Sequence, residues 1–507
     1  MGSDVEVRRD VEIPMRDGTI LRANIYLPAT DGAVPAILCA HPYGKDALPR
    51  RTRFGYRINP QFRILRQPAA VRISDETSWE APDPGWWVPR GFALVNLDVR
   101  GAGKSDGTGS LMSDGEAEDL YDAIEWIAAQ PWCDSGVAML GVSYLAISQY
   151  KVAALRPPHL RAIVPWEGFT NAYRDLFYPG GVREIGFSRL WTTLVRRSTR
   201  MRPDFGREAA ARTSEDSWWR SLVPALERIE APMLVCGSFS DANLHTRGAF
   251  RAFAEAGSRD RHLYTHRGGK WAEFYGEDAK QVQLAFLERH LKGLRRDLPV
   301  VRLEVRDRGD AVHQVRHDER WPPEANLLPL HLDRGELRHQ PAASATTVAF
   351  SSRRGAAGFA WTVPHDLEVT GEIRVRLWVS TRTSGPLSVF VGVSKWRAGR
   401  FVPFEGSYGF GRDLVATGMS RIHANSAPQE VAIELSPSST WFTAGDELRL
   451  HVGGRPLSPR NPLWGSFPAL YRASRRVPCA LHSGPDTPQL LELPIVPTRE
   501  GTLVRDP

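Results

Sequence analysis

The stretch Val137–Ala146, VAMLGVSYLA, carries the pattern that decides the fold of this 507-residue chain. Its opening residues are apolar and favour a buried strand, and the residues after Ser143 favour a helix. Ser143 therefore falls on a strand-to-helix turn that exposes its hydroxyl and directs helix N–H groups toward a developing oxyanion. This arrangement suits acyl transfer and makes Ser143 the candidate nucleophile. The motif is incomplete, because Leu145 replaces the second glycine of Gly-x-Ser-x-Gly, and most Gly-x-Ser serines are ordinary turn residues.

Short apolar runs recur along the first 300 residues and are separated by longer segments. They are Ala36–Ala40, Phe92–Leu97, Val137–Leu140, Ala162–Val164, Pro232–Cys236 and His262–Thr265. Continuous apolar strands of this kind indicate a sheet that is covered on both faces. Helical spacing between them, as in Glu116–Ala129, predicts an α/β class with a doubly wound sheet. The Asp-Gly pair within Arg16–Thr19 predicts a hairpin at the start of the chain.

The pattern changes twice along the chain and predicts three parts. We expect an α/β domain over residues 1–166 and 229–297, with a closing helix at Lys280–Leu294. Residues 167–228 are rich in Arg, Trp and Phe and interrupt the alternation, so we interpret them as a helical cap over the strand ends, where such sheets bind ligands. Over residues 298–507 the apolar period becomes two, which indicates an all-β sandwich or jelly roll.

Composition and charge narrow the classes of protein. The chain is 42% apolar and 24% charged, which is typical of globular proteins, and its net charge of +7 comes from scattered residues. We therefore expect no nucleic-acid partner. Without a Cys-x-x-Cys pair or an apolar run of about 18 residues, we expect no metal, no cofactor and no membrane partner. A cytoplasmic location is the default expectation, because residues 1–10 lack the apolar core of a signal peptide.

Two strand ends downstream of Ser143 supply an acid and a histidine in the order that Ser-Asp-His hydrolases use. Asp241 follows one apolar run and His266 follows the next. We predict Ser143 as nucleophile, Asp241 as the orienting acid and His266 as the base. His262 precedes its strand and is a weaker candidate for the base. His245 follows Asp241 too closely to face it across the site, so we expect it to line the pocket or to begin a helix.

The oxyanion of an acyl-transfer reaction needs at least two donors. We expect one to be the backbone N–H of Tyr144. The loop His41–Lys45 follows a strand and offers the Tyr43 hydroxyl as the second, although packing of Tyr43 on the cap is an equal alternative. The glycine-rich run Asp98–Gly107 lacks the spacing of a nucleotide fingerprint, and we interpret it as a structural loop with an Arg100–Asp hydrogen bond.

These motifs in combination resemble the CocE/NonD hydrolases, the cocaine-esterase-like branch of the X-prolyl dipeptidyl aminopeptidase superfamily. The segments that carry the resemblance are Met15–Pro28, Pro42–Lys45, Asp98–Gly107, Gly141–Ala146, Phe442–Leu450 and His482–Pro494. The resemblance implies a serine esterase or peptidase with an α/β-hydrolase domain, an inserted helical cap and a C-terminal jelly roll. It assigns the nucleophile to Ser143, the acid to Asp241, the base to His266 and an oxyanion donor to Tyr43.

Two loops depart from the pattern of this family. The acid loop Gly237–Asp241 lacks the Gly-Trp-x-Asp form, and Tyr264–Trp271 replaces Gly-Pro-Trp-x-His. Both departures concern substrate specificity. The resemblance places Trp166 in the acyl pocket, and we expect the pocket to be lined by Trp166, Phe169, Phe239 and His245. No clear acidic pair is available to hold a substrate amino group, which disfavours dipeptidyl peptidase activity.

The main hypothesis is a serine hydrolase that cleaves a small-molecule carboxylic ester, or an amide, through an acyl-enzyme. One alternative is an acyltransferase or cyclase that uses the same triad on a specialised metabolite, and another is a non-catalytic binding protein. A homo-oligomer is compatible with the sequence. Arginines within the cap could bind an anionic substrate or form a solvated helix face; they are Arg183, Arg189, Arg196, Arg197, Arg200 and Arg202.

Overall fold

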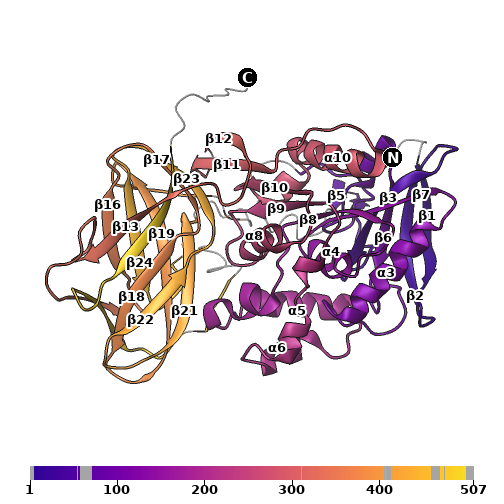
Figure 1. Cartoon of the computed structure of the whole chain (residues 1–507). Coiled ribbons are helices and arrows are strands. Elements are labelled where there is room, and N and C mark those ends of the chain that lie inside the picture. Colours follow the sequence, from indigo (N-terminus) through magenta and orange to yellow (C-terminus); the bar gives the residue numbers. More distant parts are fainter. Residues whose placement is uncertain are drawn as a thin grey trace. The chain divides into compact units, whose positions relative to one another are not determined.

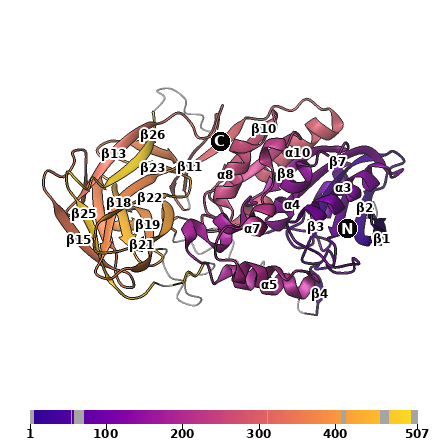
Figure 2. The same cartoon turned by 60° about the horizontal axis from the view of Figure 1, so that its bottom comes forward.

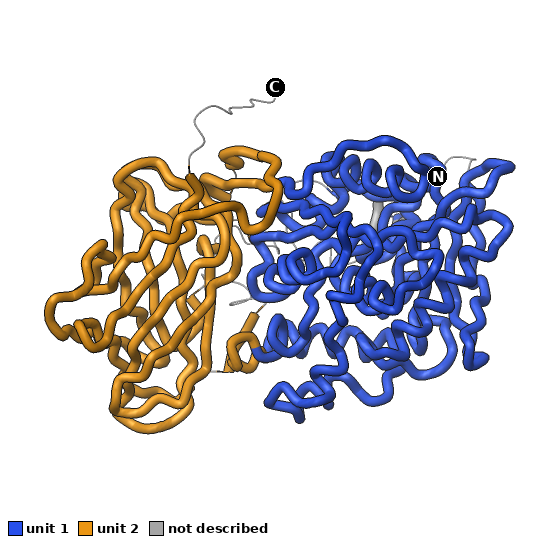
Figure 3. Tube along the Cα trace, viewed as in Figure 1, with its two compact units in different colours: residues 1–178, 185–302, 407–409 blue, residues 179–184, 303–406, 410–507 orange. Residues whose placement is uncertain are grey.

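The computed structural model describes residues 5–53, 55–57, 71–309, 311–404, 406, 413–457, 469–472 and 474–497. The chain divides into two compact units (Figure 3). The first unit comprises the described residues up to Tyr178 together with Ile185–Arg302, and it has the predicted α/β class. The second unit comprises Pro179–Glu184 and described residues from Leu303 onward, and among those residues it is built mainly of strands.

The first unit is organised around one long sheet. Its strands are β1 (Val5–Pro14), β2 (Ile20–Pro28), β3 (Val34–His41), β6 (Ala93–Asp98), β7 (Cys133–Val142), β8 (Leu160–Trp166), β9 (Met233–Ser238), β10 (Arg261–His266) and the start of β11 (Val301–Arg308). A separate two-stranded sheet contains β4 (Arg50–Thr52) and β5 (Gly55–Arg57). The antiparallel β1–β2 pair confirms the predicted hairpin.

The order of strands in the long sheet is β1, β2, β6, β3, β7, β8, β9, β10, β11. From β6 to β11 every neighbouring pair is parallel. The carboxyl ends of these strands therefore meet at one edge, which is where ligands bind in open α/β sheets. Strand β3 is buried from its second residue onward, as expected for a strand covered on both faces.

Helices cover the sheet of the first unit (Figures 1 and 2). They are α2 (Pro84–Trp87), η1 (Val88–Arg90), α3 (Asp114–Ala128), α4 (Tyr144–Ala153), α8 (Thr246–Glu255), α9 (Lys270–Phe274) and α10 (Glu277–Lys292). The Ser113 hydroxyl caps α3 by accepting from the Glu116 N–H, and Gly293 ends α10 with a φ of 64°. No helix among the described residues is long and apolar enough to cross a membrane.

The residues predicted as a cap do form short helices between β8 and β9. They are η2 (Tyr173–Phe177), η3 (Pro179–Gly181), α5 (Phe187–Ser198), α6 (Phe205–Ala211), α7 (Ser217–Ser221) and η4 (Leu226–Arg228). The short segment Pro179–Glu184 belongs to the second unit, where Glu184 pairs with Tyr471. The rest of the insertion belongs to the first unit, where Phe205 packs on Trp191 and Trp219.

The second unit is a sandwich of mainly antiparallel strands. Its strands after β11 are β12 (Ala311–Asp318), β13 (Asn326–Asp333), β14 (Glu336–Arg338), β15 (Thr346–Ser351), β16 (Ala357–Thr362), β17 (Leu367–Gly371), β18 (Arg374–Thr381), β19 (Gly385–Arg397), β20 (Arg400–Val402), β21 (Ala416–Ala424), β22 (Gln429–Glu434), β23 (Ser438–Phe442), β24 (Glu447–Gly453), β25 (Pro478–Ser483) and β26 (Leu490–Val496). Alternate residues of β18 and β24 point into one apolar core, which confirms the predicted period of two.

A buried lysine stabilises the second unit. The Lys395 ammonium, which has no exposed surface, lies 2.6 Å from Asp307 Oδ1 and 3.3 Å from Asp446 Oδ2, and it donates to the Trp441 carbonyl at 2.7 Å. Burial raises the pKa of Asp307, but hydrogen bonds from Arg397 and Lys395 outweigh it and lower that pKa to about 2. The cluster is therefore ionised in the folded state.

We expect Lys395→Met to lower the free energy of unfolding by about 1–3 kcal/mol, because the Trp441 carbonyl and the two carboxylates lose a buried donor while Arg397 still pairs with both carboxylates. The measurement is urea unfolding followed by tryptophan fluorescence. Arg374→Met is the control, because its side chain is 53% exposed and 3.6 Å from Glu434, and such pairs contribute about 0–1 kcal/mol. Equal stability of the two variants would contradict this account of the cluster.

Candidate active site

Ser143 stands on a strained turn between β7 and α4. Its backbone has φ 58° and ψ −115°, a conformation that L residues rarely adopt and that persists where the surroundings enforce it. The Ser143 N–H donates to the Trp166 carbonyl at 3.0 Å, and the Ser143 carbonyl accepts from Ala146 and Ile147. A side chain at Gly141 would bring a Cβ within 2.5 Å of Leu145 Cβ. Leu145 thus packs on the first glycine of the motif and does not disturb the turn.

The imidazole beside Ser143 belongs to His245 and not to the predicted base, His266. Ser143 Oγ and His245 Nε2 are 3.0 Å apart. His245 immediately precedes α8, as one of the two sequence interpretations expected, and its side chain is buried. The loop after β9 turns back toward the elbow within a few residues of Asp241, and this turn is what brings His245 to the serine. The structure thus places Ser143 beside His245 and His266 beside Glu167, and the catalytic role of His266 stays a prediction.

The neighbours of His245 determine its protonation. The Phe169 N–H donates to His245 Nδ1 at 3.2 Å, and the Phe169 ring stacks on the imidazole with centroids 5.6 Å apart. Burial lowers the pKa of His245 well below its ordinary value, and the charge of Lys270 lowers it further. A neutral imidazole carries one N–H, and a ring nitrogen that accepts a hydrogen bond lacks it. The remaining proton of His245 is therefore on Nε2, facing Ser143.

The predicted acid and base lie in a buried network next to this pair. His266 Nε2 is 3.1 Å from Glu167 Oε1, and His266 Nδ1 accepts from the Gly268 N–H at 3.2 Å. Asp241 accepts a hydrogen bond of 2.8 Å from the Lys270 ammonium, which also lies 3.5 Å from Glu167 Oε2. The structure therefore brings Asp241 and His266 to one site, but it pairs each of them with a different residue.

Lys270 controls the ionisation of this network. Burial raises the pKa of Glu167, but the Lys270 charge and the His266 hydrogen bond outweigh it and hold that pKa below its ordinary value. Burial raises the pKa of Asp241 to about 6 against the opposing charge of Lys270, and the Glu167 charge adds to the increase. A single ammonium thus compensates two buried carboxyls.

The network includes a group of side chains of metal-ligand type. Atoms of Glu167, Cys236 and His266 lie within 4.8 Å of one another. Burial raises the pKa of the Cys236 thiol well above its usual range, and a metal-binding cysteine must be deprotonated. Lys270 already places a positive charge beside Glu167. A metal ion at this group would therefore have to share Glu167 with the Lys270 ammonium.

A third buried carboxyl, that of Glu80, interacts with the nucleophile. The Glu80 carbonyl accepts from the Val142 N–H at 3.1 Å, and Glu80 has a φ of 65°. Burial raises the pKa of Glu80 to about 8, while the Lys270 charge, the Ser143 hydroxyl and the Tyr144 N–H act to lower it. Among the described residues, Glu80 Oε2 has no hydrogen-bond partner. Ser143 is thus flanked by a neutral imidazole and a carboxyl.

The two tyrosines that carry the predicted oxyanion donors have neighbouring rings. The Tyr144 N–H faces the Glu80 carboxyl, and the Tyr144 hydroxyl donates to Glu116 Oε2 at 2.7 Å. The Tyr43 hydroxyl accepts from Trp191 Nε1 at 3.0 Å, and its ring meets the Tyr144 ring edge-on at 6.4 Å. Tyr43 therefore packs against α5 of the insertion. Its role at the oxyanion stays a prediction.

The expected pocket residues are mostly internal. Trp166 has no exposed surface and packs on Tyr264 at 5.0 Å between ring centroids. Phe239 is buried and stacks on Phe250 at 5.2 Å. Trp166 supports the elbow through its carbonyl and Phe169 supports His245 through its N–H. These aromatic residues therefore position the reactive groups, and their placement in the structure does not show them lining an open pocket.

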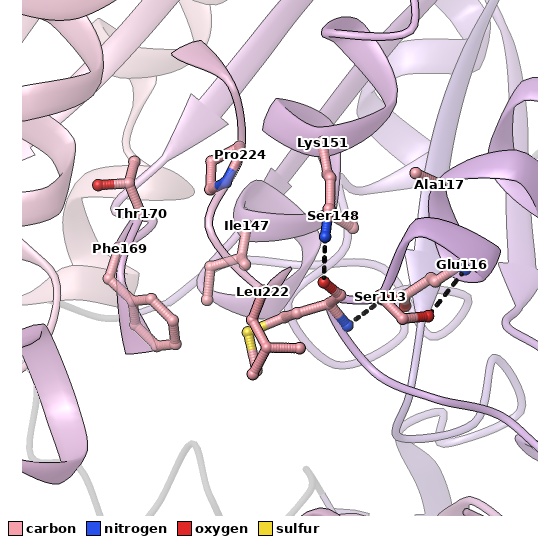
Figure 4. Close-up of a pocket in the computed structure, with 11 residues that line it drawn as sticks. Ser113, Glu116, Ala117, Ile147, Ser148, Lys151, Phe169, Thr170, Leu222 and Pro224 are labelled. Atoms are coloured by element: carbon pink, nitrogen blue, oxygen red, sulfur yellow. Dashed lines mark hydrogen bonds between the residues drawn. The ribbon is translucent and has the colours of Figure 1, made fainter. Parts of the chain in front are cut away.

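Figure 4 shows a small cavity beside α4, with Phe169, Ile147 and Leu222 around it. Its volume of about 10 Å³ holds at most a single water molecule. Glu116 at its edge accepts from the Met112 N–H at 2.5 Å and from the Tyr144 hydroxyl. The cavity is too small for a substrate, but its polar edge fixes the ring of Tyr144 and so the first turn of α4.

Most of the arginines of the insertion are solvent-exposed. Of the six arginines proposed to bind an anionic substrate, five are exposed: Arg189, Arg196, Arg197, Arg200 and Arg202. Helix α5 buries Trp191 and Val195 on its opposite face, and Arg196 donates to Asp204 at 2.7 Å. This arrangement matches the solvated helix face.

His262, the weaker candidate for the base, lies at the beginning of β10. Both of its ring nitrogens have hydrogen-bond partners there: one is 2.7 Å from the Pro299 carbonyl and the other is 2.9 Å from Asp260.

Three groups at the site carried no role in the sequence prediction: Glu80, Glu167 and Lys270. Glu167 directly follows β8, so the rule that placed Asp241 and His266 after their strands could also have found it. Lys270 lies in the loop Tyr264–Trp271, which departs from the family's histidine motif. That departure is the feature of the sequence that could have drawn attention to Lys270. Glu80 lies in a loop ahead of α2 and matches no motif.

The parallel sheet, the strained serine turn after β7 and the all-β second unit define an α/β-hydrolase with a C-terminal β domain. A family model described as X-Pro dipeptidyl-peptidase (S15 family) matches residues 17–212, and a model of the X-Pro dipeptidyl-peptidase C-terminal non-catalytic domain matches residues 293–462. A crystal structure of a CocE/NonD family hydrolase from Staphylococcus aureus superposes with a TM-score of 0.88 at 30% identity, covering 97% of this chain and 94% of that one. The chain belongs to the CocE/NonD family of hydrolases, as the sequence motifs indicated.

Two further proteins are similar to this chain. The cocaine esterase of Rhodococcus sp. is 32% identical over 192 residues, which are 37% of this chain. The matched part spans only 28% of the length of that esterase. An α-amino acid ester hydrolase shares the fold with a TM-score of 0.71 at 18% identity, over 97% of this chain and 97% of that one.

We expect Lys270→Met to destabilise the protein in a pH-dependent way. Without the ammonium, the folded-state pKa values of Glu167 and Asp241 rise, while in the unfolded chain both carboxyls ionise near pH 4. The loss of stability relative to wild type therefore grows as pH rises from about 5 to 8, and it reaches about 3–5 kcal/mol at the alkaline end.

The measurement is urea unfolding at both pH values. Lys104→Met is the control, because its ammonium is 56% exposed and paired with the partly exposed Asp10. An equal loss of stability at both pH values in Lys270→Met would show that its charge does not compensate the carboxyls.

Proposed function

We propose that this protein is a serine hydrolase that cleaves small-molecule carboxylic esters through an acyl-enzyme on Ser143. The observation that carries the proposal is the strained, partly exposed Ser143, whose Oγ lies 3.0 Å from the buried His245 imidazole. A serine held in this way at a helix N-terminus has the geometry for attack on a carbonyl carbon.

Oxyanion stabilisation is proposed to come from the first turn of α4 and from Tyr43. The Tyr144 N–H is the first amide of the helix, and α4 directs its positive end toward the elbow. The Tyr43 hydroxyl, which accepts from Trp191 Nε1 at 3.0 Å, is proposed as the second donor. Donors of this kind act where charge develops in the transition state and each contributes about 10²–10³-fold.

Esters are proposed over dipeptides for a chemical reason. A dipeptidyl peptidase must hold a substrate amino group with acidic side chains. Near Ser143, Glu167 and Asp241 are already engaged by Lys270, and Glu167 also by His266. The roles that the sequence assigned to Asp241 and His266 change accordingly. We propose that both are positioning residues in the network behind His245, and that neither exchanges a proton with Ser143.

We expect Ser143→Ala to lower kcat/KM for short-chain p-nitrophenyl esters by about 10⁴-fold or more, because the acyl acceptor is removed. Ser148→Ala is the matched control on the same helix, because the buried Ser148 hydroxyl makes no hydrogen bond among the described residues. This control should keep its activity within about twofold. An active Ser143→Ala protein would refute the proposed function.

A further inference from the structure

We propose that Trp191 is a positioning residue for the reaction, whose indole N–H holds the Tyr43 hydroxyl at the place where the oxyanion forms. The inference deepens the proposed function, because it rests on Ser143 as the nucleophile and on Tyr43 as an oxyanion donor. It gives helix α5 a part in the chemistry, beyond the cover over the strand ends that was predicted for the insertion.

The hydroxyl of Tyr43 is held directly by the insertion. Trp191 Nε1 donates to the Tyr43 hydroxyl oxygen at 3.0 Å. An indole nitrogen can only donate, so the direction of this hydrogen bond is fixed and the phenol oxygen is the acceptor. A hydroxyl that accepts a hydrogen bond is polarised and becomes a stronger donor itself. The contact therefore fixes the position of the Tyr43 hydroxyl and strengthens a hydrogen bond that it gives to an oxyanion.

The main chain before Tyr43 is fixed by the end of the same helix. The Pro42 carbonyl, which belongs to the peptide unit that leads into Tyr43, accepts from the Ser198 hydroxyl at 2.6 Å and from the Thr199 hydroxyl at 2.5 Å. A carbonyl oxygen has two lone pairs, so this peptide plane cannot turn without breaking one of the two hydrogen bonds. Helix α5 thus holds both the backbone and, through Trp191, the hydroxyl of Tyr43.

The main chain after Tyr43 is fixed by the sheet. Gly44 turns with a φ of 93°, a left-handed conformation that favours glycine. The Lys45 N–H then donates to Asp98 Oδ1 at 2.5 Å, at the end of β6. The buried Lys45 ammonium lies 2.6 Å from Asp10 Oδ1. The backbone of the loop is therefore anchored on both sides, and the side-chain torsions of Tyr43 are set by the contacts that its ring and hydroxyl make.

Trp191 also contacts the residue that supplies the other oxyanion donor. Its ring stacks on the Tyr144 ring, with centroids 6.2 Å apart and planes 25° apart. The Tyr144 ring in turn meets the Tyr43 ring edge-on at 6.4 Å. Trp191 is only 7% exposed, and its ring packs on Phe205 at 5.5 Å. One indole, fixed by its own neighbours in the insertion, thus sets the relative positions of the two tyrosines.

The positioning matters because oxyanion donors must be in place before the charge develops. A single donor contributes about 10²–10³-fold, and a displacement of about 1 Å at a reacting centre can cost about 10²-fold. A Tyr43 side chain that could rotate would lose part of this contribution. Because the oxyanion exists only in the transition state and the tetrahedral intermediate, the hydrogen bond from Trp191 should act on kcat and leave KM nearly unchanged.

The test is Trp191→Phe in the full-length chain, with short-chain p-nitrophenyl esters as substrates and the Ser143→Ala rate subtracted. Phe keeps an aromatic ring beside Tyr144 but lacks the N–H, so kcat should fall about tenfold while KM changes by less than about twofold. Trp218→Phe is the matched control, because Trp218 packs on the same Phe205 ring at 5.3 Å. This control should keep its activity within about twofold.

A double-mutant cycle separates positioning from a structural role. Tyr43→Phe alone should lower kcat by about 10²-fold or more, and Trp191→Phe should then add less than about twofold, because no hydroxyl remains to be positioned. An aryl boronic acid gives a second readout. Its tetrahedral adduct with Ser143 places an oxygen where the oxyanion forms, so its inhibition constant should rise by a factor similar to the fall in kcat.

A second variant serves if Trp191→Phe does not fold. Thr199→Val keeps the shape of the side chain and removes one of the two donors to the Pro42 carbonyl. It should also lower kcat, and this loss should also disappear in the Tyr43→Phe background. A loss from Thr199→Val that persists without the Tyr43 hydroxyl would contradict the positioning of that hydroxyl by α5.

The outcomes distinguish this inference from the proposed function. Absence of any Ser143-dependent ester hydrolysis would refute the proposed function. If Ser143 is required, an unchanged kcat in Tyr43→Phe or in Trp191→Phe would overturn the role of Trp191 alone. So would an equal loss from Trp191→Phe with and without the Tyr43 hydroxyl, because the indole would then support the fold and not the hydroxyl. A loss confined to KM would also count against it, since an oxyanion donor acts on the transition state.

Discussion

The site depends on one buried charge, the ammonium of Lys270. It lies 2.8 Å from Asp241 Oδ2 and 3.5 Å from Glu167 Oε2, and its field reaches both Glu80 and His245. Three carboxyls could not remain close together in a water-poor interior without such a cation, because uncompensated buried charges are expelled or neutralised. Burial and the same charge lower the pKa of His245, so the imidazole that lies 3.0 Å from Ser143 Oγ is neutral.

The parallel sheet brings the polar residues of the site together at one edge. Ser143, Glu167, Asp241 and His266 all follow the carboxyl ends of neighbouring parallel strands β7 to β10. This part of the architecture could be predicted from the sequence, because continuous apolar runs, a Gly-x-Ser turn and the residues after each run are local signals. The second unit could be predicted equally well, because its apolar residues recur at every second position.

The pairing within the site could not be predicted in the same way. Whether Ser143 meets His245 or His266 depends on how the loop after β9 folds and on a backbone N–H of Phe169, which belongs to the insertion. Glu80 comes from a loop whose sequence carries no motif. Rules of order along the chain locate strand ends, but they do not specify which of two nearby imidazoles turns toward the serine.

The central claim is that Ser143 carries the acyl group. The most direct measurement is mass spectrometry of the protein quenched in acid during turnover of a p-nitrophenyl ester, followed by peptide mapping. The account predicts a mass increase equal to the acyl group on the peptide that contains Ser143, and its absence in Ser143→Ala. Turnover by wild-type protein with Ser143 unmodified throughout, or with the acyl group on another residue, would contradict it.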